Sequence, residues 1–163
     1  MALKFEELRV LQAAEGVADG IWRQVVQWDP FARNVVGEQL ARAADSVGAN
    51  IAEAFGRFHY GEKLQFLYYA RGSLFETKYW LNRALARALM PSAQVQDYAS
   101  QSTDLARQLN AFAATLRAQR QGSRPEPKKV REATPEYSTV QPGGPPIPLF
   151  TEDELQWVQT INT

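Results

Sequence analysis

The stretch QLARAADSVGANIAEAFGR, residues 39–57, decides the fold class because it carries two stripes with helical spacing. The first stripe is apolar and continues one residue further; it consists of Leu40, Ala43, Ala44, Val47, Ile51, Ala54, Phe55 and Phe58. The second stripe is polar and advances by 3, 4, 4, 3 and 4 residues; it consists of Gln39, Arg42, Ser46, Asn50, Glu53 and Arg57. Steps of three and four residues predict an amphipathic helix that packs on a core.

Prolines divide the chain into a helical part and a tail. Only Pro30 and Pro91 fall in the first 121 residues, whereas the other seven prolines lie between Pro125 and Pro148. Proline interrupts helices, so residues 1–121 are predicted to be the helical domain. Four helices are expected, at about 3–28, 30–58, 61–90 and 91–121, and Asp29 followed by Pro30 has the form of an N-cap with proline at the first helical position. Short connections make neighbouring helices antiparallel, which predicts an all-α fold, an antiparallel up-and-down four-helix bundle.

The third predicted helix has apolar residues on nearly every face. Its sequence from residue 64 to residue 89 is LQFLYYARGSLFETKYWLNRALARAL. Such a helix is buried on all sides or is shared with another subunit. A four-helix bundle cannot enclose one of its own helices, so we expect a homo-oligomer. The alternative is an aromatic-rich core with some exposed rings.

The polar stripe has a structural and a functional interpretation. Arg71, Ser73 and Glu76 of the third helix are expected at a similar height, and the glycine between them, Gly72, suggests close approach of another backbone. In the structural interpretation these residues form a satisfied network, with the arginines paired to Glu53 and Glu76, because buried charges need partners. In the functional interpretation they form a catalytic or metal site. A di-iron bundle needs Glu-x-x-His motifs, which this chain lacks, so the network is favoured.

Composition limits the chemistry available to the chain. It has no cysteine and one histidine, His59, which excludes thiolate ligands and cysteine nucleophiles. We therefore expect no enzyme activity, no cofactor and no metal. No apolar run reaches the ~20 residues of a membrane helix, and the charged N-terminal stretch does not read as a signal peptide. A cytoplasmic protein without a membrane partner is expected.

The C-terminal tail is predicted to have an extended linker and a short helix. Residues 122–150 are rich in proline and glycine and are expected to be mostly disordered. Thr151 and Glu154 have the spacing of a capping box. Residues 151–163 are therefore predicted to form a short C-terminal helical segment. The apolar side chains expected to dock into a groove are Ile147, Leu149, Phe150, Leu155, Trp157, Val158 and Ile161. The groove is expected on a neighbouring subunit or on a separate protein; the alternative is a disordered tail.

The two central helices resemble a known family. Residues 39–57 and 66–84 are similar to the four-helix-bundle proteins encoded by intervening sequences in bacterial 23S ribosomal RNA genes, which are related to the accessory variability determinants of diversity-generating retroelements. The matching positions are Gln39, Arg42, Ala43, Ser46, Asn50, Ile51, Ala52, Glu53, Gly56, Arg57, Ala70, Gly72, Ser73 and Glu76. Val47 and Ala54 depart from the family's isoleucine and glycine. The resemblance covers about residues 3–121 and implies a homopentameric barrel.

For the retroelement branch, the resemblance also implies binding to nucleic acid or to a reverse transcriptase. The net charge is zero, but 11 of the 14 basic residues before Gly122 are arginines, which suit contacts with phosphate. The expected nucleic-acid contacts are Arg33, Arg83, Arg87, Arg117, Arg120, Lys128 and Lys129. We therefore predict a non-catalytic oligomeric adaptor that binds RNA or a ribonucleoprotein. The alternative is a protein–protein scaffold whose tails recruit a partner protein.

Overall fold

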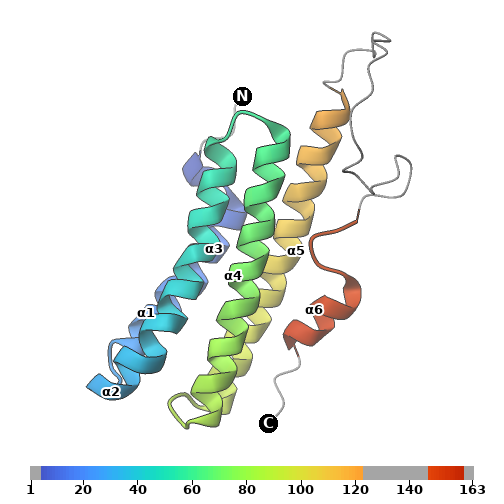
Figure 1. Ribbon diagram of the computed structural model, residues 1–163. Helices are drawn as coiled ribbons and strands as arrows, with labels where there is room; N and C mark the ends of the chain where they lie inside the picture. The colour runs from blue at the N-terminus through green and yellow to red at the C-terminus, as the bar shows by residue number, and fades with distance from the viewer. Residues whose placement is uncertain (1–4, 123–146, 160–163) are drawn as a thin grey trace, which may run out of the picture.

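The computed structural model describes residues 5–122 and 147–159, and these residues are helical apart from short connections (Figure 1). Four long helices form the body of the molecule: α1 (Arg9–Val25), α3 (Glu38–Gly56), α4 (Tyr60–Ala86) and α5 (Ser92–Gly122). A short 3-10 turn (Phe5–Glu7) precedes α1. The described residues contain no β-strand. The all-α class is confirmed.

The four long helices close into a bundle in which each helix packs on two others. Helix α1 lies against α3 and α5, and α4 lies against the same two helices. The short connections between successive helices make the bundle up-and-down, as Figure 1 shows. No helix among the described residues combines the length and the apolar character that a membrane crossing requires.

The second predicted helix consists of three helical pieces in direct succession. Asp29 caps α2 (Pro30–Ala32): its Oδ1 accepts hydrogen bonds from the backbone N–H groups of Phe31 and Ala32, both at 3.0 Å. A π-helical segment, η2 (Arg33–Gly37), then leads into α3. A Cβ on Gly37 would lie 2.6 Å from Cγ1 of Val25. The absence of a side chain there lets the π-helical segment pack closely against the end of α1.

Helix α4 ends earlier than the sequence predicted. Its last residue is Ala86, and Ala88 has a φ of 54°. A left-handed residue stops a helix, so the chain turns before Pro91 rather than at it. The backbone N–H of Leu89 then donates to the carbonyl oxygen of Ala84 at 2.9 Å, which satisfies one of the free carbonyls at the helix end.

The core runs the length of the bundle as two clusters. One cluster, around Leu67, Leu74 and Leu109, lies in the half that also contacts the tail. The other, around Ile21, Leu40 and Leu81, lies toward α2. Helix α4 buries one line of residues in both clusters but leaves Tyr68, Tyr69 and Tyr79 exposed. Within a single chain, therefore, α4 is not enclosed on all sides.

Candidate functional site: the tail site between α4 and α5

The C-terminal segment lies along the outside of the bundle, against α5 and close to α4. Its helix, α6 (Glu152–Gln159), follows a non-helical stretch whose described part begins at Ile147, and Figure 1 shows this segment beside α5. Leu149, Phe150 and Leu155 are only 2%, 1% and 4% exposed, although they come from a segment far from the core in sequence. We call residues 147–159 the tail segment, and Arg71, Phe75 and Asn110 the tail site.

Phe150 is the apolar anchor of the tail segment. Its ring stacks on the ring of Phe75, with centroids 5.6 Å apart and an interplanar angle of 23°. The guanidinium carbon of Arg71 lies 4.8 Å from the Phe75 centroid and 5.6 Å from the Phe150 centroid. Offset aromatic pairs and cations near ring faces both attract through the ring quadrupole, so the ring of Phe150 is held by specific geometry as well as by burial.

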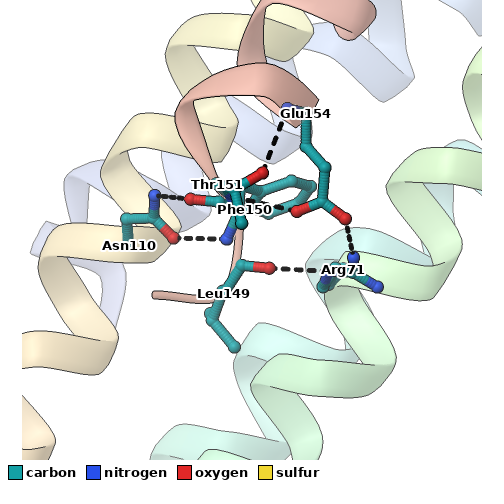
Figure 2. Close-up of polar contacts among 6 residues, drawn as sticks. All are labelled: Arg71, Asn110, Leu149, Phe150, Thr151 and Glu154. Carbon is teal, nitrogen blue, oxygen red and sulfur yellow. Dashed lines mark hydrogen bonds and ion pairs between the residues drawn. The ribbon is translucent and has the colours of Figure 1, made fainter. Parts of the chain in front are cut away.

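Asn110 of α5 binds the backbone of Phe150 at both of its polar groups. The Asn110 Nδ2 donates to the Phe150 carbonyl oxygen at 2.8 Å, and the Phe150 N–H donates to the Asn110 Oδ1 at 2.8 Å (Figure 2). Buried backbone groups need such partners, because an unsatisfied N–H or C=O is costly. One side chain therefore supplies the pairing that a neighbouring strand would otherwise give.

Arg71 of α4 binds the tail segment at two points. Its Nε donates to the carbonyl oxygen of Leu149 at 2.6 Å, and its Nη2 donates to Oε1 of Glu154 (Figure 2). The other carboxylate oxygen of Glu154 accepts from the N–H of Thr151 at 2.9 Å, while the Glu154 N–H donates to Oγ1 of Thr151 at 3.2 Å. This reciprocal pair is a capping box. Glu154 thus starts α6 and also joins it to α4.

The structure bears on several expectations about these residues. Arg71 was expected to pair with Glu53 or Glu76, but it pairs with Glu154 of the tail segment. A docking groove on another subunit or on a separate protein stays a prediction; within the single chain the tail segment lies on its own bundle. Ile147 lies outside the groove and is 73% exposed. The side chains of Trp157 and Val158, and residue Ile161 as a whole, lie outside the described residues, as does the predicted linker at 123–146.

The polar stripe of α3 forms one compact cluster with α4. Ser73 Oγ donates to Ser46 Oγ at 3.0 Å. Asn50 Nδ2 contacts the Ser46 carbonyl oxygen at 2.8 Å, Ser46 Oγ at 3.2 Å and Ser73 Oγ at 3.4 Å. These hydrogen bonds link the two helices at the middle of their interface.

The charged members of the stripe lie at the surface instead of in a buried network. Arg57 pairs with Glu53 at 2.8 Å, as expected, but both side chains are largely exposed. Arg42 pairs with Glu38 at 3.4 Å, a partner that the sequence did not predict. Glu76 accepts from Nε1 of Trp80 at 3.4 Å, and Gln39 is half-buried. Exposed pairs of this kind contribute about 0.3–0.5 kcal/mol each, so the charges of the stripe do not hold the bundle together.

The arginines expected to contact nucleic acid fall into two groups. Arg33, at the start of η2, and Arg83 and Arg87, at the end of α4, lie toward the same end of the bundle (Figure 1). We call these three the end arginines; within the described residues none of them forms an ion pair with a carboxylate. Toward the other end, Arg117 donates to the Tyr68 hydroxyl at 3.4 Å and Arg120 is exposed. Lys128 and Lys129 lie outside the described residues.

The sequence analysis missed two polar side chains at buried or half-buried positions. Asn110 of α5 is half-buried beside the buried Leu109, and its role is visible only in its hydrogen bonds to Phe150. Lys78 is only 3% exposed. It lies one helical turn after Leu74 and nearly one turn before Leu81, on the buried line of α4. Burial lowers the pKa of Lys78 to about 8, since the charged form loses hydration.

The acidic side chains do not assemble a metal centre in the described part of the chain, where no group of three or more His, Asp or Glu side chains is close enough to hold an ion. Asp45 lines a hollow of about 260 Å³ between α1 and α3. Burial, together with the nearby Asp19 carboxylate, raises the pKa of Asp45. His59 lies in the exposed turn before α4, with its ring edge-on to Phe58.

Residues 6–111 match the family described as 23S rRNA-intervening sequence protein. The chain belongs to this family. The match covers α1, α3 and α4 and ends one residue after Asn110, so the tail segment lies outside the residues that match the 23S rRNA-intervening sequence proteins. A search of curated proteins finds no match to the chain.

Proposed function

We propose that this protein is a non-catalytic, homo-oligomeric adaptor that binds RNA or a ribonucleoprotein, such as a complex of RNA with a reverse transcriptase. Membership in the 23S rRNA-intervening sequence protein family supports an association with RNA. The observation that carries the proposal is that the three end arginines lie toward one end of the bundle and that their guanidinium groups have no carboxylate partner among the described residues.

Other exposed arginines differ from the end arginines because they are paired with carboxylates. Arg42, Arg57 and Arg107 are exposed, and each forms an ion pair with a carboxylate of its own helix. A paired guanidinium must give up that contact before it can bind a phosphate oxygen. The end arginines carry no such cost and can donate two parallel hydrogen bonds to one phosphate. The paired arginines therefore provide a matched control.

Replacing the three end arginines by glutamine is expected to weaken RNA binding by roughly tenfold or more at low salt. It should also lower the slope of log affinity against log salt by about 2, because each contact between an arginine and a single-stranded phosphate contributes about 0.7. Fluorescence anisotropy of a labelled RNA over a salt series measures both quantities. Arg42→Gln, Arg57→Gln and Arg107→Gln combined should change the slope much less. Equal losses in the two triple variants would refute a role for this end of the bundle.

The oligomeric part of the proposal is supported by the outer face of α4. Tyr68, Tyr69 and Tyr79 are about half-exposed, and Gly72 lies between them in sequence. A Cβ on Gly72 would meet nothing within 4 Å of its own chain, so no contact inside the chain requires a glycine there. A glycine in mid-helix costs about 1 kcal/mol against alanine. Close approach of a second copy at this face would account for it, and a closed pentamer is the arrangement we propose.

Gly72→Gln is expected to dissociate the oligomer into monomers of 18.3 kDa, because a side chain at this position would separate the two surfaces while remaining harmless in the single chain. Gly16 of α1 is an exposed glycine that also has no neighbour within 4 Å, and Gly16→Gln should leave the assembly intact. Light scattering coupled to size-exclusion chromatography gives the masses. A Gly72→Gln protein that keeps the wild-type mass would show that α4 does not form the interface.

The alternative function, a scaffold whose tails recruit another protein, has weaker support. Leu149, Phe150 and Leu155 are already buried against their own chain, so they would have to leave the tail site before they could bind a separate partner.

A further inference from the structure

The contacts of the tail site depend on particular residues at fixed positions in the segment that occupies it. Phe75 and Arg71 enclose the Phe150 ring, and Asn110 pairs with the Phe150 backbone. Arg71 also requires a carboxylate four residues after the phenylalanine, where Glu154 lies, and that carboxylate must itself cap a helix that begins after Thr151. Leu149 and Leu155 complete the apolar contacts. The pattern is Leu-Phe-Thr-x-x-Glu-Leu, a non-helical Leu-Phe dipeptide followed by a capped helix.

The chain between α5 and the tail segment is much longer than docking on the same chain requires. Asn110 lies 12 residues before Gly122, the end of α5, which is about 18 Å along the helix at 1.5 Å per residue. The connection from residue 123 to residue 146 contains 24 residues and could span up to about 80 Å if extended. The length of this connection therefore also permits the tail segment to reach the tail site of an adjacent molecule.

We propose that the tail site is a peptide-recognition site that accepts the tail segment of a second copy of this chain, so that copies exchange tails. A second copy carries the recognised pattern in full, and every contact that holds the tail segment in its own site can form unchanged with a neighbour. The occupant is an acidic, N-capped peptide with one buried phenylalanine. This inference is independent of RNA binding and of the face of α4 that carries Gly72.

A labelled peptide of residues 145–163 tests the site with the full-length protein. Phe150→Ala empties the site of its own tail while leaving Arg71, Phe75 and Asn110 in place, so this variant should bind the peptide saturably in fluorescence anisotropy. Wild-type protein should bind it about tenfold more weakly or worse, because its own tail competes at an effective concentration near millimolar. The double variant Asn110→Ala, Phe150→Ala should not bind it.

Competition by a second full-length chain tests whether a neighbour's tail reaches the site. Asn110→Ala protein keeps an intact tail but has a weakened site, so in excess it should displace the labelled peptide from the Phe150→Ala variant. The double variant, whose tail lacks Phe150, should not displace it. If the labelled peptide binds the Phe150→Ala variant but excess Asn110→Ala chain does not displace it, the proposal that copies exchange tails is wrong.

Substitutions in the peptide test the same contacts without a further change to the protein, so they do not depend on how well a second protein variant folds. A peptide carrying Phe150→Ala should lose binding to the Phe150→Ala protein, and a peptide carrying Glu154→Gln should bind at least several-fold more weakly, because it loses the ion pair with Arg71. Circular dichroism melting verifies that the protein is folded. A folded Phe150→Ala chain that binds no wild-type peptide at millimolar concentration would overturn the proposal.

Discussion

A Phe150→Ala chain is expected to lose the docking of its tail segment while keeping its four-helix bundle. Removing a buried phenylalanine side chain costs about 3–5 kcal/mol, and every 1.4 kcal/mol changes an equilibrium tenfold. The docking equilibrium should therefore fall by a factor of 100 or more. The large effect arises because this ring is 1% exposed, stacks on Phe75 and lies under the guanidinium of Arg71.

Hydrogen exchange measures this loss at the residues that dock. In the wild type, the amide of Phe150 donates to Asn110 and the amide of Leu155 donates to the carbonyl oxygen of Thr151, so both should be protected; local opening sets their exchange. In Phe150→Ala, amides from 150 to 156 should exchange at least a hundredfold faster, with α1 and α3 little changed. Ile147→Ala is the control, because Ile147 belongs to the same segment but is 73% exposed. Unchanged protection in Phe150→Ala would contradict the anchoring role.

Lys78→Met is expected to stabilise the protein at neutral pH by roughly 1–3 kcal/mol. Burial lowers the pKa of Lys78 from 10.5 to about 8, which means that folding disfavours its charged form; one pKa unit corresponds to about 1.4 kcal/mol. Methionine has a similar length and no charge to desolvate, so it should fill the same space on the inner line of α4. We expect the gain in the free energy of unfolding to be smaller than the full pKa shift of Lys78 would give, because a lysine ammonium can reach toward water.

The pH dependence separates this effect from a simple packing change. Below pH 8 the ammonium is charged in both the folded and the unfolded states, so the cost of burying it is present in full. As the pH rises from about 8 toward 10.5, the folded state loses its proton first and the cost disappears. The stability difference between Lys78→Met and the wild type, from urea unfolding, should therefore shrink across that window. Lys63→Met, at a half-buried lysine in the first turns of α4, controls for the loss of a charge on this helix. A difference that stays constant with pH would refute the role of the buried ammonium.

Local signals predicted the helices and their starts well. Asp29 followed by Pro30 is a cap made by atoms two and three residues apart, and the capping box of Thr151 and Glu154 spans three residues. Such hydrogen bonds depend only on nearby sequence, so they can be recognised without a fold. The end of α4 was missed by four residues, because the left-handed Ala88 carries no glycine or asparagine signal.

The candidate site was only partly predictable. The spacing of the apolar and capping residues indicated that Leu149, Phe150 and Leu155 needed a partner surface, but nothing in the sequence identified that surface. Asn110 and Phe75 are separated from Phe150 by 40 and 75 positions. Arg71 had two acidic candidates on α3 and α4, and the structure pairs it with neither.

The sequence by itself determined the all-helical class, the order of the four long helices, the caps that start α2 and α6, and membership in the 23S rRNA-intervening sequence protein family. These features depend on helical periodicity and on contacts within a few residues. Only the tertiary structure decided which charges lie at the surface and which arginine binds the tail segment. It also decided that Lys78 is buried. Helical spacing assigns a side chain to a face, but its partner and its hydration depend on which distant segment packs against that face.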